Sequence, residues 1–126
     1  MTSVLGYART FFIGGQYRPK PLSSLDEEII RFHDMLEKVA RHIKRGTPLL
    51  QGMSEERLLQ GPLSDAMTHA GQLAMLRRLA GFPVPPENFI FADIKPEQLG
   101  VKQAEPVSPD EKWTEAPAGW LPPFQR

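Results

Sequence analysis

The chain of 126 residues contains no cysteine, which excludes a disulfide framework, a thiolate nucleophile and a thiolate metal site. It has no excess charge of either sign, because 15 basic residues balance 15 acidic ones. The sequence therefore offers no basic surface for nucleic acid or an anionic membrane. It also lacks an apolar run of the ~20 residues that a membrane-spanning helix needs. These absences predict one cytoplasmic domain over residues 1–126, with no nucleic-acid or membrane partner.

Proline is infrequent at first and becomes common near the C-terminus. Nine of the 13 prolines lie between Pro83 and Pro123, which excludes regular helix over most of that stretch. Bulky apolar residues in the same region distinguish it from a disordered tail. They are Phe89, Ile90, Phe91, Ile94, Trp113, Trp120 and Phe124. We therefore predict that residues 82–126 form an irregular arm whose aromatic side chains lie on the bundle or on a partner subunit.

The stretch from Gly61 to Gly81 predicts a helix. Pro62 suits a first helical turn, Gly81 suits a C-terminal cap, and Pro83 prevents continuation. Gly71 in mid-helix costs roughly 1 kcal/mol against alanine, which suggests the close approach of another helix. Residues spaced three or four apart form two rows on this helix. The first row is apolar and comprises Leu63, Ala66, Met67, Ala70, Leu73 and Ala74; the second comprises Asp65, His69, Gln72 and Leu76.

Two further helices are predicted before this one. A short apolar helix runs from Ser3 to Ile13 and is stopped by Gly14 and Gly15. A longer one begins at the capping box of Ser24 and Glu27 and ends at Gly46. Its apolar residues follow the spacing of a bundle seam, and they are Leu25, Ile29, Phe32, Leu36, Val39 and Ile43. A short helical turn is expected at Ser54 to Leu59.

The residues from Thr68 to Gly81, followed by Pro83, resemble the last bundle helix of the DinB/YfiT-like family. Members of that family are four-helix bundles, often dimeric, and many bind a divalent metal through three histidines. His69, with Gly71 and Gln72 after it, matches the second of these ligands. The first falls on Asp65, and no residue matches the third. The resemblance covers residues 60–90 best and is looser over residues 1–50.

The resemblance implies an all-α, up-down helical bundle of three main helices that lacks the family's first helix. A bundle missing one helix leaves Val4, Leu5, Phe11 and Phe12 short of cover, so we expect a homodimer.

A metal site is predicted on the last helix. A carboxylate and an imidazole one turn apart can bind one ion, and zinc, nickel, manganese or iron accept this ligand set. The predicted ligands are Asp65 and His69, with Gln72 close by. His33 is a better third ligand than His42, because carboxylates lie near it in the sequence. In the alternative, Asp65 stabilises the helix N-terminus and hydrogen-bonds His69, while both other histidines lie in solvent or at helix boundaries.

Two functions are compatible with these features. The first is a divalent-metal-dependent hydrolase or thiol-dependent transferase, acting on a small molecule through an incomplete metal site. The alternative is a non-catalytic dimeric bundle, stress-associated or structural, whose metal site has decayed. The sequence has no nucleophile elbow and no glycine-rich phosphate loop, which argues against serine hydrolases and nucleotide-binding enzymes.

Overall fold

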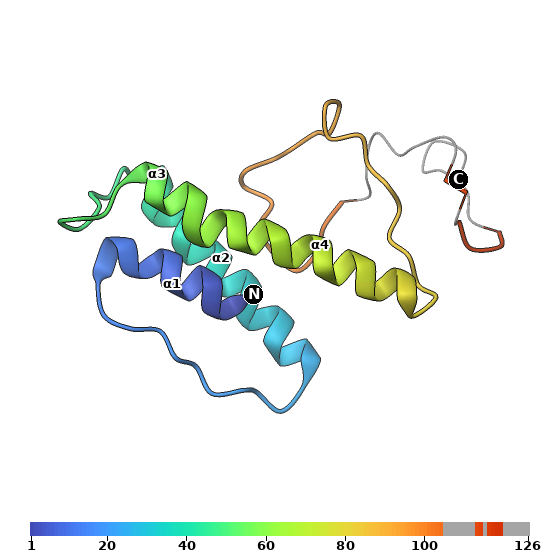
Figure 1. The fold of residues 1–126 in the computed structure, drawn as a ribbon, viewed down its shortest axis with the longest axis horizontal. Helices are drawn as coiled ribbons and strands as arrows, with labels where there is room; N and C mark the ends of the chain where they lie inside the picture. Colours follow the sequence, from blue (N-terminus) through green and yellow to red (C-terminus); the bar gives the residue numbers. More distant parts are fainter. Residues whose placement is uncertain (105–112, 115, 120–126) are drawn as a thin grey trace. The chain divides into compact units, whose positions relative to one another are not determined.

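The structure is a computed structural model that describes residues 1–104, 113–114 and 116–119. It contains α1 (Thr2–Ile13), α2 (Leu25–Lys44), α3 (Glu55–Leu58), a π-helical turn η1 (Leu59–Leu63) and α4 (Ser64–Leu79), shown in Figure 1. No strand occurs among the described residues, so the predicted all-α class is confirmed, with α1, α2 and α4 as its three longer helices. In the same part of the chain, no helix has the length and apolar character needed to cross a membrane.

The chain divides into two compact units. The first comprises Met1–Ala70 with Leu99–Val101, and the second comprises Gly71–Gln98 and Lys102–Arg126 as far as the chain is described. The division falls inside α4 and not at the predicted start of the arm near residue 82. The single domain over residues 1–126 stays a prediction.

Local hydrogen bonds fix the start of α2. The Ser24 hydroxyl accepts a hydrogen bond from the Glu27 amide at 3.2 Å, as the predicted capping box requires. The Glu27 carboxylate in turn accepts from the hydroxyl of Ser23 at 2.7 Å and from its amide at 3.1 Å. Beside it, Glu28 is paired with Arg31. The Glu28 carboxylate also accepts a hydrogen bond from the Leu22 amide at 2.9 Å, so two backbone amides that precede the helix are bonded to carboxylates.

These bonds predict that acid destabilises the protein. The Ser23 hydroxyl and amide lower the pKa of Glu27 below its ordinary value of 4.5, and the Arg31 guanidinium lowers the pKa of Glu28 in the same direction. Because the folded pKa values are depressed, the stabilisation is complete above pH 4.5 and is lost as the pH falls below that value. We expect the melting temperature to drop between pH 6 and pH 3, and to drop less in Glu27→Gln. The control Glu37→Gln should keep the wild-type pH dependence; equal dependence in all three proteins would contradict this assignment.

The core lies where α1 packs against α2 and η1. Its buried members are Ala8, Phe11, Phe12, Val39 and Leu58, with Leu49 and Leu63 packed on the outside. Leu5 and Phe11 are only 2% and 3% exposed, and the Leu50 amide donates to the Phe11 carbonyl at 2.9 Å. The expectation that α1 lacks cover within the chain is therefore wrong. Residues 47–63 pack against the side chains of α1 that we expected to be exposed because the first bundle helix is missing.

The buried face of α2 differs from the predicted seam. Val39 is buried as predicted, but the other buried residue is Met35, and Phe32 and Leu36 are only half-buried. Ile29 is 37% exposed and Leu25 is 75% exposed. A helix of 12 residues cannot cover one of 20, because each residue adds only 1.5 Å of length. The first two turns of α2 consequently keep Leu25 and Ile30 largely in solvent.

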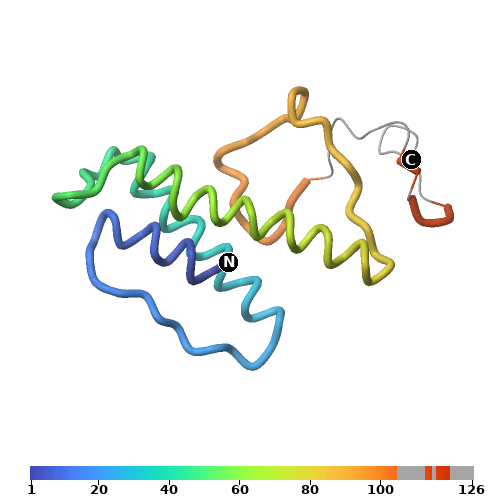
Figure 2. The backbone as a smooth tube through the Cα atoms, viewed as in Figure 1, coloured from blue at the N-terminus to red at the C-terminus, as the bar shows by residue number. Residues whose placement is uncertain are grey.

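The segment between α1 and α2 sets the direction of the pair. It leaves α1 through Gly14 and Gly15, whose φ values are 72° and 78°, and crosses back beside the pair (Figures 1 and 2). As a result α1 and α2 run in the same sense, which departs from the predicted up-down order. The Tyr17 ring in this segment lies against Gly6, where a Cβ would come within 1.9 Å of the ring. Only glycine leaves room for that contact.

The sequence predicted that Pro62 begins the last helix, and the structure shows that it does not. It is buried inside η1, and the helical path is continuous from α3 through η1 into α4. In a π turn each amide bonds five residues back, which relieves the clash between a proline ring and the carbonyl before it. The Ser64 hydroxyl also donates to the Leu59 carbonyl at 2.7 Å. The turn of helix predicted at Ser54 to Leu59 is confirmed as α3 and the start of η1.

No residue of α4 is buried, which corrects the predicted burial of its apolar row. Leu73 is 50% exposed and Ala70 is also exposed, while Ala66 is half-buried. At Gly71 no atom of the described chain lies within 4 Å of where a Cβ would be, so the helix expected to approach there is not part of this chain as described.

After Gly81 the described chain forms no helix, in agreement with its prolines. The apolar side chains that we expected to anchor this segment are not buried: Phe89, Ile90, Phe91 and Ile94 are between 68% and 87% exposed. Trp113 is half-buried. Trp120 and Phe124 lie outside the described residues, so their predicted role stays a prediction.

Candidate functional site

Asp65 and His69 lie one turn apart in the first half of α4. His69 Nε2 is 3.5 Å from Asp65 Oδ1, so the i, i+4 spacing read from the sequence does bring an imidazole to a carboxylate. The His69 side chain is 40% exposed and that of Asp65 is 54% exposed. Solvent therefore screens the pair, and its contribution to stability is small. Gln72 follows on the same row and is exposed.

The two other histidines are engaged elsewhere. His33 Nδ1 lies 2.8 Å from the Leu99 carbonyl oxygen, and its ring meets the edge of Phe32 at 5.2 Å. His42 stacks on Phe12, with ring centroids 5.0 Å apart and planes 7° apart, and its Nδ1 is 3.3 Å from the Thr47 hydroxyl. His42 is thus held between α2 and α1, whereas His33 lies in the middle of α2 and contacts the segment that contains Leu99.

The donor set does not fit the metal that the resemblance implies. Metal sites of this kind use at least three protein ligands, and the structure brings together two, Asp65 and His69. Over residues 1–104, 113–114 and 116–119, no group of three or more histidine, aspartate or glutamate side chains is arranged to hold an ion. His33 is not assembled with the pair in a single chain.

Asp65 also borders an open groove that the sequence did not predict. The groove has a volume of about 570 Å³ and is lined by Ser3, Val4, Tyr7, Gln60, Gly61, Pro62 and Asp65. It exists because the π turn brings residues 60–65 against the first half of α1. No periodicity in the sequence could place Tyr7 near Asp65, since their proximity depends on the packing of α1 against η1.

The comparisons with known proteins do not extend the resemblance. The chain matches no protein-family model, no curated protein and no solved structure. Membership of the DinB/YfiT-like family therefore stays a prediction that rests on the residues from Thr68 to Pro83.

Proposed function

We propose that this protein is a non-catalytic, dimeric helical bundle with a structural role, in which α4 joins two copies. The observation that carries the proposal is the apolar surface of α4. Leu73, Leu76 and Leu79 are 50%, 57% and 77% exposed in the single chain and lie within about 120° of the helix circumference, at about 100° per residue. An isolated helix of 16 residues is marginal in water and is normally stabilised by burying one face. Cover from outside the chain would supply that stabilisation.

Charge supports a second copy as the source of this cover. The N-terminal end of α4 carries the acidic Asp65, and its C-terminal end carries Arg77 and Arg78. Antiparallel pairing of α4 with its own copy places opposite charges and opposite helix-dipole ends together. Each copy then contributes the same face of α4, which is the isologous arrangement of a two-fold dimer. Light scattering of the wild-type protein should give twice the chain mass of 14.2 kDa at micromolar concentration.

A second candidate is the metal-dependent chemistry of the family that the chain resembles. The 3.5 Å approach of His69 to Asp65 favours it, because both atoms can face one ion. Asp65 and His69 of one chain supply only two ligands, so the third ligand would have to come from the second chain of the dimer. The substrate class under this candidate is a small molecule.

Metal titration separates the two candidates. If the pair binds an ion, zinc, nickel or manganese should bind the wild-type dimer, and His69→Ala should weaken binding at least about tenfold. His42→Gln is the matched control, since His42 lies away from Asp65 and should not change the affinity. Affinity should also fall as the pH is lowered, because protons compete with the metal for the imidazole. Absence of calorimetric binding in wild type and variants alike would leave the structural role standing.

A further inference from the structure

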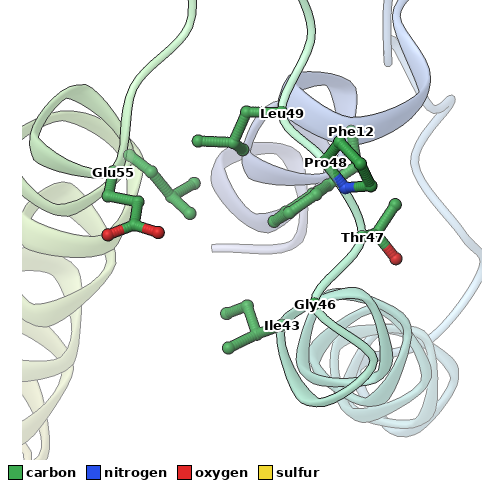
Figure 3. Close-up of a pocket in the computed structure, with 8 residues that line it drawn as sticks. Phe12, Ile43, Gly46, Thr47, Pro48, Leu49 and Glu55 are labelled. Atoms are coloured by element: carbon green, nitrogen blue, oxygen red, sulfur yellow. The ribbon is translucent and has the colours of Figure 1, made fainter.

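A second hollow lies at the end of the bundle where α1 and α2 both terminate. It has a volume of about 420 Å³, at the small end of the range for ligand pockets. The residues that line it come from the last turns of α1 and α2, the connecting segment and α3. They are Phe12, Ile43, Gly46, Thr47, Pro48, Leu49, Glu55 and Leu58 (Figure 3).

The walls of this hollow are apolar and held in place. Phe12 and Leu58 are 8% and 6% exposed and belong to the core. The Phe12 ring is backed by the stacked ring of His42, which is itself 3.3 Å from the Thr47 hydroxyl. The Thr47 hydroxyl is thus occupied by a neighbour. A preformed apolar wall favours the apolar body of a small ligand without a large ordering cost.

Among the residues that the structure describes, Glu55 is the only ionisable side chain that lines the hollow. Figure 3 shows its carboxylate on the side opposite Phe12, with Leu49 and Ile43 between them around the open space. Within the described part of the chain, Glu55 forms no side-chain hydrogen bond or ion pair, whereas Arg57 beside it is bound to the Gly52 carbonyl. An ionised carboxylate facing an apolar hollow attracts a cation and repels an anion.

We propose that this hollow binds a small organic cation, with an aromatic or branched aliphatic body against Phe12, Leu49 and Leu58 and an ammonium group beside the Glu55 carboxylate. The ligand would be a protonated primary amine or a quaternary ammonium ion with one apolar group. A carboxylate of the same shape would be repelled by Glu55. The site is independent of Asp65 and His69 and of dimer formation through α4.

The test uses three probes of matched shape: 2-phenylethylamine, 2-phenylethanol and 3-phenylpropionate. In a nitrogen–proton correlation titration of the full chain, the amine should bind most tightly and the carboxylate most weakly. The shifted amides should be those of Thr47, Leu49 and Leu58. Glu55→Gln should reduce the preference for the amine over the alcohol by about two- to fivefold, as expected for a charge pair near solvent. Glu56→Gln, one residue away and outside the lining, is the matched control and should leave that preference unchanged.

A second variant tests the hollow itself. Leu49→Trp should fill the space and abolish binding of both the amine and the alcohol, while circular dichroism reports whether the fold is kept. Equal affinity for the amine and the alcohol, or a preference that survives Glu55→Gln, would overturn the proposal. Shifts that map to α4 instead of residues 47–58 would also overturn it, because they would identify the dimer surface as the apolar binding site.

Discussion

Phe11→Ala should lower the free energy of unfolding by about 3–5 kcal/mol, the range for removing a buried phenylalanine ring. Phe11 is 3% exposed, meets the Tyr7 ring edge-on at 5.5 Å, and shares the core cluster with Val39 and Leu58. Its loss leaves a cavity at the point where α1 meets α2. Since a small protein is stable by only about 5–15 kcal/mol, the melting temperature should fall by at least about 10 °C.

The matched control is Ile13→Ala on the same helix. Ile13 is 51% exposed, so its truncation should cost less than about 1 kcal/mol. Chemical denaturation followed by circular dichroism measures both changes. Equal loss of stability in the two variants would mean that α1 does not pack through the face that carries Phe11.

Replacing Leu76 and Leu79 together by glutamate should convert the proposed dimer into a monomer. The two side chains are 57% and 77% exposed in one chain, so the monomer should tolerate both changes. In the dimer each carboxylate would be buried against apolar surface, at a cost of several kcal/mol. We therefore expect the dissociation constant to rise at least about 100-fold.

Analytical ultracentrifugation over a concentration series measures this change. Gln51→Glu is the control, because it adds one negative charge, where the double variant adds two, in an exposed turn outside α4. It should leave the dissociation constant as in wild type. A double variant that stays dimeric, or a wild-type protein that sediments as a monomer, would refute the role of α4.

The sequence predicted what is determined locally. The caps of α2 at Ser24 and Gly46 follow from side-chain oxygens and from a positive φ of 61° at glycine, neither of which needs a distant partner. The approach of His69 to Asp65 follows from helical spacing alone. In each case the residues that decide the outcome lie within one turn of each other.

Features that depend on distant packing could not be predicted in this way. The apolar spacing predicts a buried seam along the whole of α2. The short α1 buries only Met35 and Val39, and Ile29 stays exposed. The groove beside Tyr7 arises from the packing of η1 against α1, and the hollow beside Glu55 depends on the course of the segment that joins α2 to α3; no periodicity encodes either feature. The missing amide of Pro62 predicts a helix start, and nothing in the local pattern indicates a π turn.

The π-helical turn makes the orientation of α4 depend on chain length as well as on residue type. Each residue of an α-helix advances the chain by 1.5 Å and by about 100° around the axis. Deleting one residue within Leu59–Leu63 would turn the whole of α4 by roughly that angle relative to α3. Asp65 would then leave the groove beside Tyr7 without any change in the sequence of α4 itself. An insertion or deletion here should therefore redirect a surface that most single substitutions would leave in place.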